Sequence, residues 1–133
     1  MQTYITVLAF VVNAEGRYLL LQRSPERHEH PNVWNVVTGY INERESVEAA
    51  AVREVKEETN LDTEILIVGK PEFSDEEDKR WVGFPVLLRD LGSSGFEMDE
   101  DESQTSKWVT KEEFSQMGLK WLAEILQRLK AQP

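Results

Sequence analysis

The sequence predicts an α+β fold with a mixed, mostly antiparallel sheet. Short runs rich in β-branched, aromatic and aliphatic residues alternate with turn signals along most of the chain. Residues 47–59 instead have the composition of a helix, and helical segments also end the chain. With 133 residues, 40% of them apolar, the chain can bury one core. We therefore expect residues 1–133 to form a single domain.

The first half of the chain contains the clearest strand signals. Residues 4–12 and 18–22 flank the turn Asn13-Ala14-Glu15-Gly16, whose Asn and Gly tolerate positive φ, so a β-hairpin is expected. Residues 24–32 hold two prolines and several charges and are expected to form a loop. Strand character returns over residues 33–38, and Gly39 is expected to break it.

One helix is predicted with both ends defined. Ser46 is a favourable N-cap, residues 47–59 lack Gly and Pro, and Asn60 suits the left-handed C-terminal position. Further strands are expected over residues 63–68, 81–88 and 107–109, and further helices over residues 111–117 and 119–130. Two acidic runs, residues 74–78 and 97–103, are expected to be solvated loops.

Charge and composition exclude several function classes. The net charge is −10 and the pI about 4.7, which opposes unaided binding to nucleic acid or to an anionic membrane. No cysteine is present, which excludes disulfides, thiolate nucleophiles and Cys-based zinc sites. The apolar run over residues 5–12 is too short to cross a bilayer, so we expect a cytoplasmic protein. If such an acidic protein is an enzyme that acts on anionic substrates, it needs a cation between its own negative charges and those of the substrate.

The charges on the predicted helix lie on an unexpected face. At about 100° per residue, Glu54 and Glu58 fall within about 20° of Val47, on the stripe that should pack inward. Glu54 also lies three and four residues from Glu57 and Glu58, spacings at which like charges repel. A divalent cation with oxygen ligands would offset this repulsion, whereas a solvated helix with outward-bent glutamates is the alternative.

The residues around this helix follow a known pattern. Gly39 is followed after five residues by Glu45 and after seven more by Arg53-Glu54-Val55-Lys56-Glu57-Glu58-Thr59-Asn60-Leu61. This series resembles the Nudix box, Gly-x5-Glu-x7-Arg-Glu-U-x-Glu-Glu-x-Gly-U with U aliphatic, and departs from it only at Asn60. The resemblance spans residues 39–61. It implies a small, MutT-like Nudix hydrolase, an α/β/α sandwich with the Nudix loop-helix.

The resemblance also implies a metal-dependent reaction. Mg²⁺, with Mn²⁺ as a possible substitute, would be held by Glu54, Glu57, Glu58 and the carbonyl of Gly39. Water would attack a diphosphate, and its general base is expected to be Glu57 or Glu54. Glu102, in the later acidic loop, is the alternate base or an outer metal ligand. Arg53 and Glu45 are expected to position the loop and the ligands.

The substrate is predicted only as a class: a nucleoside triphosphate or a related diphosphate compound. Arg23 is expected to contact phosphate, and Trp34, Trp81 and Phe84 to stack on a base. His28 and His30 are expected to be solvated.

Three alternatives to this class remain open. Residues 34–39 resemble relatives that act on dihydroneopterin triphosphate. Dinucleoside polyphosphates, ADP-ribose and nucleotide sugars are further possibilities, and a non-catalytic nucleotide sensor on the same fold is the third. A monomer or a homodimer is expected.

Overall fold

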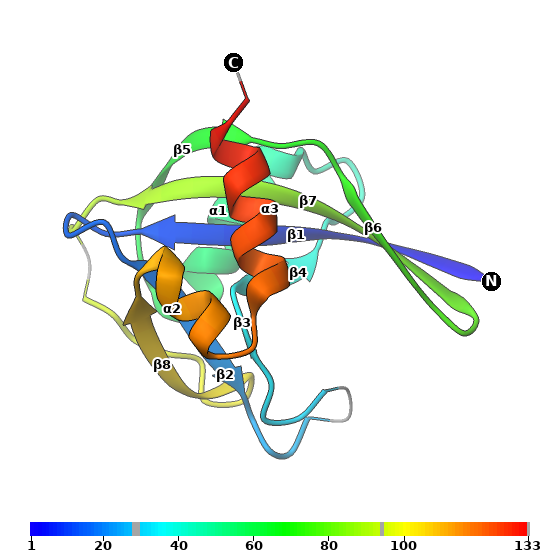
Figure 1. Ribbon diagram of the computed structural model, residues 1–133, viewed down its shortest axis with the longest axis horizontal. Coiled ribbons are helices and arrows are strands. Elements are labelled where there is room, and N and C mark those ends of the chain that lie inside the picture. The colour runs from blue at the N-terminus through cyan, green and yellow to red at the C-terminus, as the bar shows by residue number, and fades with distance from the viewer. Residues whose placement is uncertain (28–29, 94, 133) are drawn as a thin grey trace.

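In the computed structural model, which describes residues 1–27, 30–93 and 95–132, helices cover both faces of one mixed sheet (Figure 1). The elements in chain order are β1 (Gln2–Val12), β2 (Tyr18–Arg23), β3 (Trp34–Asn35), β4 (Val37–Tyr40), α1 (Val47–Thr59), β5 (Thr63–Val68), β6 (Glu72–Glu76), β7 (Lys79–Asp90), β8 (Ser103–Val109), α2 (Lys111–Gln116) and α3 (Lys120–Lys130). No described helix is long and apolar enough to cross a membrane.

The sheet is built around the parallel pair β1 and β7, which stays in register from Gln2↔Lys79 to Val12↔Arg89. The other pairings are antiparallel, and the strand order is β3-β2-β1-β7-β5. β4 pairs with β1 only over residues 6–9, and β2 meets β1 only near Val12↔Tyr18. The first half of β1 therefore has β4 as its neighbour, which brings the segment before α1 close to β7.

Alternation along the strands divides the core into two layers. On β1, Val7, Ala9 and Val11 pack against Ala50, Ala51 and Val55 of α1. Phe10, between them, faces the cluster that contains Leu122, Leu126 and Leu129 of α3. The α/β/α sandwich that was predicted is thus confirmed.

The box helix forms as the sequence predicts. The side chain of Ser46 accepts a hydrogen bond from the Ala49 N–H at 3.0 Å, and Asn60 ends the helix at φ 63. Glu54 and Glu58 are partly buried beside the apolar residues of α1, whereas Lys56 is exposed. The helix therefore turns two carboxylates inward.

Two predictions on the strands were wrong. The acidic run over residues 74–78 is not a loop throughout, because Glu72–Glu76 form strand β6, in which Asp75 pairs with Arg80 across the hairpin at 2.9 Å. Gly39 does not break a strand: it lies inside β4, opposite Val7. The expected strand over residues 33–38 is instead divided at Val36 into β3 and β4.

Candidate active site

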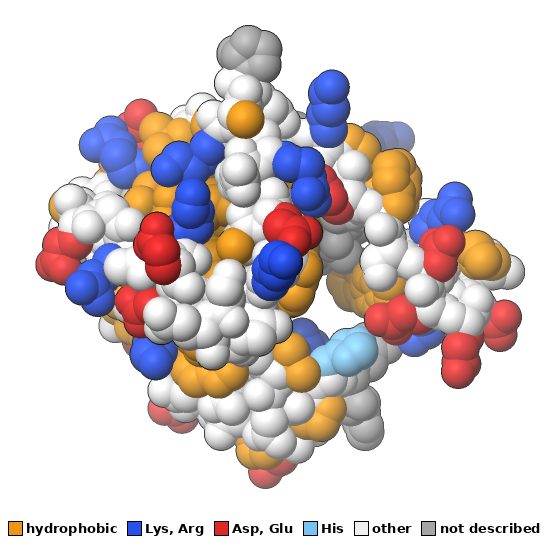
Figure 2. Space-filling view, in the orientation of Figure 1, with side chains coloured by type: hydrophobic (Ala, Val, Ile, Leu, Met, Phe, Trp, Pro, Cys, Tyr) orange, Lys and Arg blue, Asp and Glu red, His pale blue; other side chains and the backbone are white. Residues whose placement is uncertain are grey.

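A cleft of about 740 Å³ opens over the first halves of β1 and β7 and reaches from α1 to α3. Thr6 and Thr38, on β1 and β4, lie at its floor, and side chains from β6 and from the loops after β2 and before β8 complete its walls. Figure 2 shows this face hollowed between the body and the β6–β7 hairpin. The volume is in the range of nucleotide-sized ligand sites.

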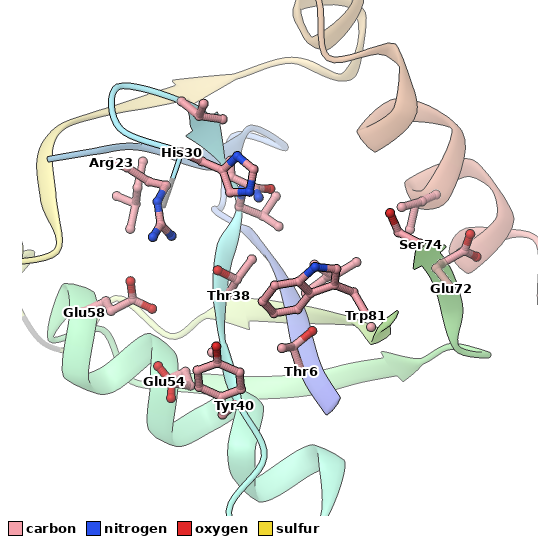
Figure 3. A pocket seen from close by; sticks show the side chains of 18 of the residues that line it. Thr6, Arg23, His30, Thr38, Tyr40, Glu54, Glu58, Glu72, Ser74 and Trp81 are labelled. Carbon is pink, nitrogen blue, oxygen red and sulfur yellow. The ribbon is translucent and has the colours of Figure 1, made fainter. Parts of the chain in front are cut away.

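The three glutamates of the box helix, Glu54, Glu57 and Glu58, all line this cleft. Figure 3 shows Glu54 and Glu58, one helical turn apart, extending from α1 on the same side. Their common direction follows from the four-residue spacing. The helix thus presents several carboxylate oxygens to one end of the cleft.

Arg53 fixes part of this acidic end. Its guanidinium donates two hydrogen bonds to Glu45, at 2.7 and 2.9 Å, and further bonds to Glu54 at 2.9 Å and Glu57 at 3.2 Å. It also donates to the Tyr40 carbonyl at 3.0 Å, which ties α1 to the end of β4. The guanidinium holds the pKa of Glu45 down at about 2, chiefly through these hydrogen bonds. Loop and helix are therefore linked by one cation.

Glu58 lies outside this network. Its Oε2 is buried and has no hydrogen-bond partner among the described residues. Burial, together with the negative charges of Glu54 and Asp99, raises the pKa of Glu58 to about 8, against a smaller opposing effect of Arg27 and Arg23. An ionised Glu58 therefore needs positive charge that the protein itself supplies only in part.

Gly39 and Glu54 are in close contact. A Cβ added at Gly39 would overlap the carboxylate of Glu54, so only glycine leaves room for that side chain. Burial also raises the pKa of Glu54, although the hydrogen bond from Arg53 opposes the shift. The glycine of the box thus admits a carboxylate close to the backbone of β4.

Arginines border the same end of the cleft. Arg23, at the end of β2, and Arg27, in the loop that follows, both line it. Arg27 forms an ion pair with Glu102, whose carbonyl accepts a hydrogen bond from the Ser24 N–H at 3.0 Å. The two loops are therefore joined beside the glutamates, and Figure 3 shows Arg23 on the side of Glu58.

Aromatic side chains lie farther along the cleft. Trp81 stacks on Tyr4 with ring centroids 4.8 Å apart, and Tyr40 lies 6.4 Å from Trp81. Trp81 and Tyr40 both line the cleft (Figure 3). A preformed aromatic surface suits a planar group.

Comparison with known proteins identifies a family that covers most of the chain. The model of the NUDIX domain family matches residues 3–129. This chain belongs to the NUDIX family. Nudix hydrolase 5 of Arabidopsis thaliana is 36% identical over 83% of the chain, and Nudix hydrolase 2 of the same plant is 32% identical over 80%. The chain spans only 37% and 38% of the length of these relatives.

Two solved structures share the fold of this chain. The MutT protein from Methanosarcina mazei Go1 superposes with a TM-score of 0.80 at 21% identity, covering 96% of this chain and 93% of that one. A C. elegans Ap4A hydrolase in a binary complex gives a TM-score of 0.77 at 20% identity, covering 96% of both chains.

The donor set of this NUDIX domain fits a hard divalent cation. The orphaned Glu58 oxygen and the neighbouring Glu54 and Glu57 offer only oxygen ligands. Within the described ranges, no three acidic or histidine side chains are already gathered around one point. A cation bound by several of these glutamates would therefore have to draw their carboxylates together, with water and phosphate completing its shell.

The structure does not bring every expected substrate residue to the cleft. Trp34 packs against the core cluster beneath α3, and Phe84 lies on the opposite face of β7 from Trp81; neither is among the described residues that line the cleft. His30 does line it, half exposed, 3.9 Å from Glu76. His28 lies outside the described residues.

Several cleft residues were not singled out from the sequence. They are Arg27, Asp99 and Tyr40, together with a stripe on α3 that comprises Trp121, Glu124, Ile125 and Arg128. The three-, four- and seven-residue spacing of that stripe was a readable signal for one helix face. Arg27 and Asp99 lie in loops, where sequence periodicity gives no such signal.

Proposed function

We propose that this NUDIX domain hydrolyses a diphosphate linkage in a nucleoside diphosphate derivative with the help of a divalent cation. The observation that carries the proposal is the buried Oε2 of Glu58, which has no hydrogen-bond partner within the described part of the chain and lies beside Glu54 in a cleft that also holds arginines. Mg²⁺ is the proposed ion, and Mn²⁺ a substitute.

The metal ligands in this proposal are Glu54, Glu57, Glu58 and the backbone carbonyl of Gly39. A bound cation supplies charge neutralisation for the diphosphate and lowers the pKa of a coordinated water. Arg53 holds Glu54 and Glu57 in place through its hydrogen bonds. It therefore acts as a positioning residue, together with Glu45.

The proton of the attacking water is proposed to pass to a box glutamate, Glu57 or Glu54. Glu57 is exposed and Glu54 is partly buried, so both can be reached from the cleft. Glu102 is the alternate base or an outer ligand, and its ion pair with Arg27 holds it at the cleft wall. The phosphates would lie beside Arg23 and Arg27, where two guanidinium groups offset their charge.

The nucleoside is proposed to rest on Trp81 and Tyr40. Both side chains line the cleft, and Figure 3 shows Trp81 on the far side of Thr38 from Glu58 and Tyr40 beside Glu54. The stack of Trp81 on Tyr4 fixes the indole before any ligand binds. The aromatic surface would orient the substrate without contributing to bond cleavage.

Wider features of the protein remain part of the proposal. Both core layers share one sheet, which supports a single domain over residues 1–133. The net charge of −10 favours a small nucleotide over nucleic acid or an anionic membrane as the partner. A monomer or homodimer is proposed as the assembly.

The test is a turnover screen with identification of both products. Nucleoside triphosphates, dinucleotides, nucleotide sugars, ADP-ribose and dihydroneopterin triphosphate are each supplied with Mg²⁺, with Mn²⁺ and with chelator. We expect cation-dependent cleavage between two phosphorus atoms of at least one compound. Tight binding of one compound without any product would contradict the proposal and leave a nucleotide sensor.

A further inference from the structure

Helix α3 has two faces with different surroundings: one packs in the core, and the other lines the cleft. Leu122, Leu126 and Leu129 are in the core, whereas Trp121, Glu124 and Arg128 line the cleft; Ile125, also in the core, borders it. Trp121 is the largest of these, and it is 44% exposed. An exposed indole on the wall of a cleft, at the opposite end from α1, is available for a ligand.

The wall beside α3 is formed by β6. Arg128 donates hydrogen bonds to both carboxylate oxygens of Glu72, at 2.7 and 3.4 Å, and so joins the helix to the strand. Glu72 and Ser74 pair in register with Gly83 and Trp81 of β7, which places their side chains on the cleft face, as Figure 3 shows. The ion pair thus holds two walls of one compartment together.

Gly83 contributes no side chain to the floor of this compartment. A Cβ there would come within 3.2 Å of Leu8 Cδ1, and Leu8 also lines the cleft. The compartment is therefore bounded by Trp81 on one side and the Trp121 stripe on the other. It is continuous with the part of the cleft that holds the box glutamates.

The charges at the two ends of the cleft differ. Arg23 and Arg27 border the end beside Glu58, where phosphate is proposed to bind. At the α3 end, Glu124 and Glu72 present carboxylate oxygens, and Arg128 is already paired with Glu72. These acceptors suit hydroxyl or amino donors. The two cations beside them, Arg128 and Lys120, already pair with Glu72 and Glu124, so they offer little to another phosphate.

From this arrangement we infer that α3 and β6 form a subsite for a second uncharged ring with hydrogen-bond donors, and that Trp121 determines specificity for it. The inference rests on the proposed function, because that function places the diphosphate between this subsite and α1. The subsite selects diphosphates that carry an organic group at both ends over nucleoside triphosphates, which carry one at a single end. The second ring is a sugar or another nucleobase, since both can stack on indole and donate hydrogen bonds.

The kinetic test compares ATP, ADP-ribose and diadenosine diphosphate in wild type and Trp121→Ala. We expect the wild type to prefer a two-ended compound, and the substitution to raise KM for that compound at least tenfold while kcat stays within twofold. Both parameters for ATP should stay within twofold. A change confined to ADP-ribose identifies the second ring as a sugar, and one confined to diadenosine diphosphate identifies it as a nucleobase.

The matched control is Phe96→Ala, which removes an aromatic side chain that is 41% exposed and is not among the described residues lining the cleft. It should leave all three compounds unchanged. Equal effects of Trp121→Ala on all three compounds, no effect on any of them, or a wild type that cleaves only ATP would each overturn the inference.

A binding measurement separates this inference from the proposed function. The Trp121 indole N–H resonance is assigned by its loss in Trp121→Ala and followed with millimolar ADP-ribose, diadenosine diphosphate or ATP in the presence of EDTA. We expect it to move with a two-ended compound and not with ATP. Movement in a protein without turnover would support the subsite while the hydrolase proposal fails. A stationary Trp121 signal in an active protein would overturn the subsite alone.

Discussion

Two groups of carboxylates at α1, one around Arg53 and one at Glu58, differ in their hydrogen-bond partners. Around Arg53, the oxygens of Glu45, Glu54 and Glu57 accept hydrogen bonds from a single guanidinium. Around Glu58, one buried oxygen has no partner among the described residues, and the pKa rises to about 8. The first group holds its geometry without a metal, whereas the second is fully stabilised only when positive charge arrives. The protein therefore stabilises the carboxylates around Arg53 itself, but stabilises that of Glu58 only in part.

The largest effect is expected from removing the charge of a proposed ligand. Glu54→Gln and Glu57→Gln should each lower kcat by about 10² to 10⁴-fold, because cation binding and proton transfer both need an ionised carboxylate. Steady-state turnover of the substrate found in the screen measures this. Glu64→Gln, at an exposed ion pair with Arg89, serves as control and should remain fully active. Turnover within tenfold of wild type in both cleft variants would refute their assignment.

A smaller loss is expected from crowding the Glu54 carboxylate. Gly39→Ala introduces a methyl group where that carboxylate lies, so Glu54 must move and kcat should fall about 10 to 10²-fold. Gly95→Ala is the matched control, because a Cβ there meets nothing within 4 Å. If both alanine variants kept wild-type turnover, the close contact would have no part in the reaction.

The hydrogen bonds around Arg53 can be weakened without removing its positive charge. Arg53→Lys keeps a cation but loses the two-point contact with Glu45, so kcat should fall about tenfold and KM should change less than threefold. Arg80→Lys removes an equivalent two-point contact with Asp75 on an exposed hairpin and should change neither parameter. A rise in KM with unchanged kcat would mean that Arg53 binds substrate instead of positioning glutamates.

The unpaired region should appear as a pH dependence of stability in metal-free protein. The pKa of Glu58 is raised from 4.5 to about 8, so the unfolded chain loses this proton first and the stability contributed here falls as pH rises between those values. Glu58→Gln should therefore stabilise the protein at pH 9, on the order of 2 kcal/mol, and leave it nearly unchanged at pH 4. Urea unfolding at both pH values with chelator present measures the difference. Equal stability of the two proteins at pH 9 would show that ionised Glu58 is already satisfied.

Local signals in the sequence predicted α1 to the residue, because its cap at Ser46, its composition and Asn60 are all encoded nearby. Strand β6 was not predicted, since its acidic residues are stabilised by pairing with Lys79 and Arg80 across the hairpin. The sequence also did not predict on which face of the sheet Trp34 and Phe84 lie. These faces depend on the division between β3 and β4 and on the register of β7, which are set by tertiary contacts.

The site was predicted to a similar degree. Spacing alone identified the acidic face of α1, because a helix places residues four apart on one side. It could not show that Glu58 Oε2 has no partner among the residues described while Glu54 is paired, because that difference depends on Arg53, Asp99 and the loop of Arg27. The Trp121 stripe had the right spacing, but its role required knowing which of the two faces of α3 meets the core.

The most direct test of the cation site is a Mn²⁺ titration followed by electron paramagnetic resonance, in wild type, Glu58→Gln and the control Glu64→Gln. We predict that wild type and Glu64→Gln bind Mn²⁺ alike and that Glu58→Gln binds it at least tenfold more weakly. Equal Mn²⁺ affinity in all three proteins would contradict the account, because the unpartnered carboxylate would then not be the place where the cation binds.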